Sequence, residues 1–67
     1  MAVKLAARGN RRLINELERR GWWFDGPNGG WMNYHVRNVD GMLLPLGTIE
    51  EVCKYLDIDA DEYAQQN

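Results

Sequence analysis

The chain has 67 residues, a single cysteine and a formal net charge of -2 at pH 7. A chain of this length closes one core that hides about 60% of its unfolded surface, which excludes a second domain and disfavours a deep small-molecule active site. The lone Cys53 excludes an internal disulfide, and no stretch reaches the roughly 20 apolar residues of a membrane span. The sequence therefore predicts one cytoplasmic domain, with no cofactor, no metal and no membrane contact.

The charges are distributed unevenly along the chain. Residues 1–20 carry six basic side chains against two acidic ones, whereas residues 40–67 carry one basic side chain against seven acidic ones. The basic half indicates either a face that contacts nucleic acid or a helix whose arginines only face the solvent. Arg11 and Arg12 are the candidates on this helix for contact with RNA or a protein partner.

The first predicted element is a helix. Leu13, Ile14 and Leu17 recur at helical spacing, Asn10 can cap a helix that starts at the next residue, and Gly21 can end it. Residues 1–9 then form either a separate turn or a frayed arm.

Three antiparallel strands are expected next. The aromatic run at residues 22–24 has high strand propensity, and residues 25–30 are rich enough in turn formers to predict a loop. A second strand over residues 31–38 leads through the turn signal Asp40-Gly41 into a third strand over residues 42–46. Pro45 cannot donate to a ladder, so this strand ends there or lies at an edge.

Alternation along the second strand assigns its side chains to two faces. Met32, Tyr34 and Val36 should face the core. The opposite, exposed face should carry the candidates for binding RNA or a partner: Trp31, Asn33, His35 and Arg37. Adjacent strand residues face opposite sides, so one of Trp22 and Trp23 must point away from the helices.

A second helix should begin after Thr48, because Thr48-Ile49-Glu50-Glu51 is a capping box. Its apolar stripe for packing on the sheet consists of Ile49, Val52, Cys53 and Leu56. Asp59 and Glu62 can cap a short last turn that returns Ile58 and Tyr63 to the core, and residues 64–67, polar except for Ala64, should form a frayed tail. The expected fold class is thus α+β: helix, three-stranded meander, helix, with a short C-terminal helical turn.

This order, from Leu13 to Tyr63, resembles the HicA-type mRNA interferase toxins, whose fold is like that of a double-stranded-RNA-binding domain. In the first half of the chain, the features that match are the helix ending in a basic pair and Gly21-Trp22, and Gly30 just before the second strand. In the second half, they are the Asp40-Gly41 turn, the third strand ending in Pro45, and Gly47-Thr48-Ile49 at the start of the last helix. The resemblance implies a small RNA-binding component of a toxin-antitoxin pair, whose partners are RNA or an antitoxin-like protein.

The sequence departs from that family at the position of the catalytic residue. HicA-type toxins carry a catalytic histidine in a Gly-Ser-His motif at the start of the second strand, and Asn33 occupies that place here. Asparagine cannot shuttle a proton at neutral pH, so weak or absent ribonuclease activity is expected. If cleavage occurs, the candidate acid or base is His35, the only histidine, with Arg37 beside it to stabilise phosphate charge. The alternative function is a non-enzymatic accessory protein of a mobile element that binds another protein.

Overall fold

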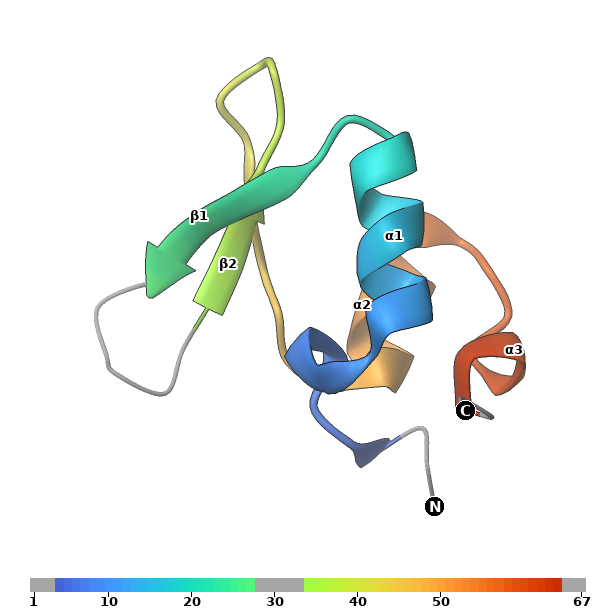
Figure 1. The fold of residues 1–67 in the computed structure, drawn as a ribbon. Helices are drawn as coiled ribbons and strands as arrows, with labels where there is room; N and C mark the ends of the chain where they lie inside the picture. Colours follow the sequence, from blue (N-terminus) through green and yellow to red (C-terminus); the bar gives the residue numbers. More distant parts are fainter. Residues whose placement is uncertain (1–3, 28–33, 65–67) are drawn as a thin grey trace.

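A computed structural model describes residues 4–27 and 34–64 of the chain. It confirms the predicted fold class, with the sheet on one side and α1 and α2 together on the other (Figure 1). In chain order the elements are η2 (Ala7–Gly9), α1 (Arg11–Arg19), β1 (Trp23–Pro27), β2 (Tyr34–Arg37), β3 (Leu43–Pro45), α2 (Ile49–Leu56) and α3 (Asp61–Ala64).

Helix α1 begins and ends where the sequence predicts. Asn10 is the N-cap residue, and its Oδ1 atom accepts a hydrogen bond of 2.9 Å from the amide of Leu13. At the other end Gly21 has a φ of 93°, a left-handed conformation that favours glycine. This turn of the chain lets the Trp22 amide donate to the Leu17 carbonyl, 2.9 Å away, as in a Schellman motif. Trp22 is thereby returned to the core.

The three strands form an antiparallel meander with β2 in the centre. Val36 of β2 pairs with Phe24 of β1 and with Leu44 of β3, so these three side chains share the face toward the helices. The expected hairpin between β2 and β3 is present, with the Gly41 amide 3.0 Å from the Asn38 carbonyl. Strand β3 lies at an edge of the sheet and ends at Pro45, as predicted.

The first strand is longer than its sequence pattern predicts. The turn formers from Asp25 onward predict a loop, but β1 runs on to Pro27. Between Phe24 and Pro27 the strand holds one more residue than the facing part of β2, which makes a β-bulge. The prediction was wrong because Gly26, with a φ of 89°, absorbs the irregularity and lets the strand continue.

The second predicted strand can be compared only in part. Its described portion is Tyr34–Arg37, while the expected positions of Trp31, Met32 and Asn33 lie outside the described residues. Asn38, the last predicted strand residue, instead caps the hairpin, because its Oδ1 atom accepts from the amides of Asp40 and Met42 at 3.0 Å each.

Helix α2 starts with the predicted capping box. The Thr48 Oγ1 atom accepts from the Glu51 amide, and the Glu51 Oε1 atom accepts from the Thr48 amide, both at 3.1 Å. The short last turn α3 follows, where the Asp59 carboxylate accepts from the Asp61 amide at 2.9 Å. Ile58 and Tyr63 pack against the core, as the sequence predicts.

The core lies between the sheet and the helices and contains the expected apolar stripes. Its most deeply buried side chains, each at most 1% exposed, include Leu13, Leu17, Val36, Ile49, Val52 and Cys53. Tyr34 and Leu56, which were expected among them, are partly buried against this cluster.

The segment before α1 is held against the segment that leads into α2. The Ala7 amide donates to the Gly47 carbonyl at 2.8 Å, and the Ile49 amide donates to the Leu5 carbonyl at 2.9 Å. Ala7 is fully buried. Two segments about 40 residues apart in sequence are thus joined, and η2 is fixed next to the sheet.

Candidate functional site

Three polar side chains meet on the outer face of the sheet, which is the face away from the helices. The Asp25 Oδ2 atom accepts a hydrogen bond of 2.9 Å from Arg37 Nε and lies 2.8 Å from Arg37 Nη2. The same oxygen lies 3.3 Å from His35 Nε2, which is long for a hydrogen bond between nitrogen and oxygen. Arg37 is therefore the main partner of Asp25. Its hydrogen bond holds the pKa of the Asp25 carboxyl below the ordinary value, and His35 contributes less.

The structure buries His35, so the prediction that this side chain is exposed was wrong. The side chain is only 7% exposed. It lies in the central strand between Pro45 of β3 and the bulge of β1, and the bulge places Asp25 alongside the ring. One ring nitrogen faces Asp25, and the other, Nδ1, is buried without a hydrogen-bond partner among the described residues. A general acid or base needs a ring nitrogen within reach of the substrate, and this conformation presents none.

The outer face also carries exposed apolar side chains. Trp23, Arg37 and Leu43 are directly opposite one another across the three strands, and we call them the outer row. Trp23 is 42% exposed and Leu43 is 45% exposed. Trp22, by contrast, is 8% exposed, which confirms that the two adjacent tryptophans face opposite sides.

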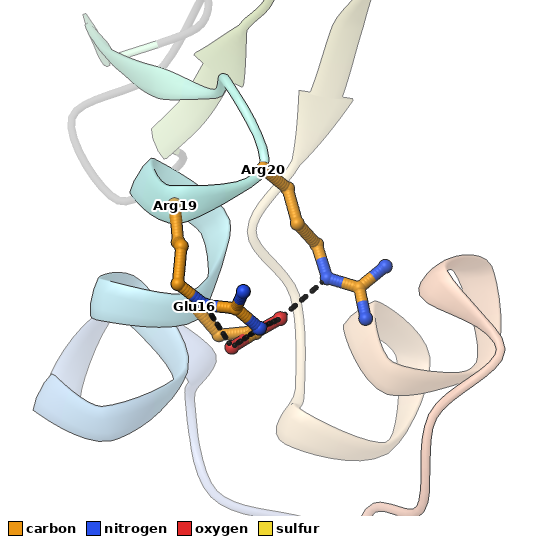
Figure 2. Close-up of polar contacts among 3 residues, drawn as sticks. All are labelled: Glu16, Arg19 and Arg20. Carbon is orange, nitrogen blue, oxygen red and sulfur yellow. Dashed lines mark hydrogen bonds and ion pairs between the residues drawn. The ribbon is translucent and has the colours of Figure 1, made fainter.

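Several cations of the basic N-terminal half are engaged in ion pairs. Figure 2 shows the Glu16 carboxylate between Arg19 and Arg20, each with a contact of 2.6 Å. The hydrogen bonds from Arg19 and then Arg20 hold the pKa of Glu16 below its ordinary value. Both arginines also stand at the C-terminal end of α1, where the helix dipole favours cations. Lys4 pairs with Glu50 at 2.9 Å.

Arg11 and Arg12 occupy the opposite end of α1. The Arg12 Nη1 atom donates to the Glu62 carbonyl at 2.6 Å, and its guanidinium lies 5.3 Å from the centre of the Tyr63 ring. Arg12 therefore helps to hold α3 against α1. Arg11 is exposed and makes no hydrogen bond or ion pair with the described residues.

A shallow hollow lies on the helix side of the sheet, between η2 and strands β1 and β2. Its volume is about 430 Å³, and the described residues that line it are Arg8, Gly9, Phe24 and Tyr34. The Arg8 guanidinium lies over the Tyr34 ring, 5.1 Å from its centre, within the range of a cation–π contact. The Phe24 ring meets Tyr34 edge to face, with centres 6.4 Å apart. The hollow thus combines one cation with two aromatic rings.

The sheet separates the site residues that the sequence predicts. Arg11 and Arg12 belong to the helix layer, whereas His35 and Arg37 face outward from β2. Trp31 and Asn33 lie outside the described residues.

The hollow was missed by reasoning from sequence. Sequence patterns assign Phe24 to a strand, Tyr34 to the core, and Arg8 to a separate turn or a frayed arm. Their meeting depends on the bonds that hold η2 against the loop before α2, and no local sequence pattern signals this contact.

Cys53 and the acidic residues supply no further chemistry. Cys53 is fully buried, and burial raises the pKa of its thiol, with the nearby Asp59 adding to the effect. Within the described ranges, no three His, Cys, Asp or Glu side chains lie together as metal ligands. No helix in these ranges is long and apolar enough to cross a membrane.

Comparison with known proteins assigns no family to the chain: no family model, no curated protein and no solved structure matches it.

Proposed function

We propose that the chain is a small cytoplasmic RNA-binding module, similar in kind to the HicA-type toxins, that holds RNA without cleaving it efficiently. The observation that carries this proposal is the hollow in which Arg8 lies over Tyr34 beside Phe24. Proteins that bind single-stranded RNA combine cations for the phosphates with aromatic or guanidinium planes for the bases. Its protein partner is an antitoxin-like protein that covers the same surface.

The position of Arg11 supports the proposal. This arginine opens α1, where the positive end of the helix dipole disfavours a cation by roughly 0.3–1 kcal/mol. No acidic residue in the first turn compensates. Arg19 and Arg20 have a structural reason in their pairing with Glu16, whereas Arg11 pairs with no acidic residue in the described parts of the chain. A cation that the helix does not need, two residues after the lining residue Gly9, suits contact with a phosphate backbone.

The expectation of weak cleavage rests on His35 and Asn33. His35 is buried, and its Asp25 neighbour is engaged mainly by Arg37. Asn33, at the place where the toxins carry histidine, has no titratable group. General acid–base catalysis typically contributes about 100- to 10,000-fold to a rate, and a chain that presents no accessible imidazole loses that factor.

The proposal is tested by titrating a labelled RNA with the protein at increasing salt concentration. Each phosphate contact adds about 0.7 to the slope of log affinity against log salt for a single strand. The Arg11→Ala variant should bind more weakly, with its slope reduced by about one contact. The control is Arg19→Ala, which removes the same charge from the same helix at a position paired with Glu16, and its slope should stay unchanged. Undetectable or salt-insensitive binding by the wild-type protein would contradict the proposal.

The outer row favours a second candidate function, a non-enzymatic accessory protein that binds another protein. Trp23 and Leu43 expose apolar surface on either side of Arg37, and tryptophan and arginine dominate the energetics of many protein interfaces. Failure of the salt titration would make this candidate the preferred one.

A further inference from the structure

The hollow lined by Arg8, Gly9, Phe24 and Tyr34 has a size and a lining that suit one planar ligand group. Its volume of about 430 Å³ lies near the lower end of the range for small-ligand sites, which is roughly 300–1,000 Å³. Gly9 contributes no side chain, and a Cβ atom built on it would meet nothing within 4 Å, so this wall is open. None of the four described residues that line the hollow is acidic, so none of them repels an anionic ligand.

Phe24 is an exposed aromatic wall of the hollow. The residue is 44% exposed although it faces the helix side of the sheet, opposite Val36. Its edge-to-face contact with Tyr34 and the Arg8 guanidinium over the Tyr34 ring join the three planar groups into one surface. A planar ligand that enters the hollow therefore meets an aromatic ring and a guanidinium plane.

We propose that this hollow takes one unstacked base of a single-stranded RNA, with the base on Phe24, Arg8 at the base or its own phosphate, and Arg11 on a flanking phosphate. The inference rests on the RNA binding proposed above and specifies its substrate as unpaired RNA. Bases in a duplex are stacked on both sides and cannot enter such a site, whereas bases of single strands can be splayed onto aromatic side chains.

The test compares two neighbouring aromatic residues of β1 that differ in the face they occupy. Phe24 is 44% exposed on the helix side, and Trp23 is 42% exposed in the outer row. Binding of a labelled unstructured oligonucleotide and of a duplex of the same length is measured by fluorescence anisotropy. Phe24→Leu should weaken single-strand binding by about tenfold or more, which is the size of one base–aromatic stack. Trp23→Leu should stay within about twofold of the wild-type protein.

A second variant, at Arg8, tests the base site without changing a residue of the β-sheet. Arg8→Lys preserves the charge but removes the planar guanidinium, so single-strand affinity should fall several-fold while the salt slope stays unchanged. Arg8 is exposed, so the fold should tolerate this change, and thermal melting of every variant verifies it.

The outcomes separate the inference from the function on which it rests. Equal effects of Phe24→Leu and Trp23→Leu, or a larger effect of Trp23→Leu, would place the RNA elsewhere and overturn the base site. RNA binding that favours the duplex and is unchanged by Phe24→Leu would overturn the base site and leave RNA binding intact. No binding of either RNA by the wild-type protein would overturn both.

Discussion

At the scale of single residues, one carboxylate oxygen contacts two side chains of the central strand on the outer face of the sheet. Asp25 Oδ2 is shared by Arg37 at 2.8–2.9 Å and by His35 at 3.3 Å. The shorter, charge-assisted contact with Arg37 is the stronger one. Asp25, which with His35 resembles a catalytic acid–base pair, therefore mainly ties β1 to β2. The residue that looked most catalytic in the sequence is therefore best explained as part of the structure.

This tie predicts a pH-dependent contribution to stability. Hydrogen bonding to Arg37 lowers the pKa of Asp25 in the folded state below its ordinary value of 3.8. The contribution is therefore fully present above about pH 4 and is lost as the pH falls through the lowered pKa of the folded state. Asp25→Asn should lower the urea midpoint relative to the wild-type protein at neutral pH, and the difference should shrink as the pH falls through the lowered pKa of Asp25.

Asp40→Asn is the matched control for Asp25→Asn. The Asp40 carboxylate makes no hydrogen bond or ion pair with the described residues, so this variant should unfold at the wild-type midpoint at neutral pH. A difference between Asp25→Asn and the wild-type protein that grows on acidification would contradict the role assigned to the Arg37 contact.

At the scale of elements, the start of α1 is joined to the last helical turn, α3. Asn10 is fully buried, caps α1 through its Oδ1 atom, and donates from Nδ2 to the Tyr63 carbonyl at 2.6 Å. Arg12 makes a second bond from α1 to the same part of α3. One side chain thus both starts a helix and holds the C-terminal turn against it.

Asn10→Ala should destabilise the protein by about 1–3 kcal/mol, because it removes a helix cap and leaves a partly buried carbonyl without its donor. Asn10→Ser separates the two roles. Serine keeps a cap acceptor for the Leu13 amide but is too short to replace the bond to Tyr63, so its loss should be smaller than that of alanine. Chemical denaturation measures both values, and equal losses for the two variants would show that the cap contributes nothing.

At the scale of the whole molecule, a single small core carries the stability. A domain of 67 residues is expected to have a free energy of unfolding of roughly 3–10 kcal/mol. Leu17, which is 1% exposed, lies with Leu13 and Ile14 on the face of α1 that packs on this core. Its loss cannot be absorbed by a second core.

Leu17→Ala should cost about 2–5 kcal/mol, enough to unfold much of the protein at room temperature. Leu5→Ala is the control, because Leu5 is 56% exposed and its backbone carbonyl, which the substitution retains, makes its bond to Ile49. Circular dichroism melting compares the two, and cooperative melting of Leu17→Ala at the wild-type temperature would refute the assigned core.

The parts of the fold that local chemistry determines could be predicted from sequence, and the parts that depend on strand register could not. The Asn10 cap, the Gly21 stop and the Thr48 capping box each need only a few neighbouring residues, and all three are present. The contact of His35 with Asp25 depends on a bulge in the neighbouring strand, where the sequence pattern predicts a loop. The register between β1 and β2 was therefore the part of the candidate site that sequence patterns could not predict.

The hollow on the helix side shows the same limit for function. Its residues come from a short turn and two strands, and alternation correctly placed Tyr34 on the helix side without showing that Arg8 lies over its ring. The charge distribution of the sequence indicates the basic half of the chain as a candidate surface, but it could not distinguish Arg11 from the arginines that Glu16 engages.

The most direct test of RNA binding without efficient cleavage is a mobility-shift experiment in which the RNA is recovered from the shifted band and its length is measured. A labelled single-stranded RNA is incubated with an excess of the protein, so that one sample reports both RNA binding and RNA cleavage. The proposal predicts a shifted complex from which the RNA is recovered at full length. Absence of a shift would contradict RNA binding, and rapid conversion of the RNA to fragments would contradict the structural role assigned to His35.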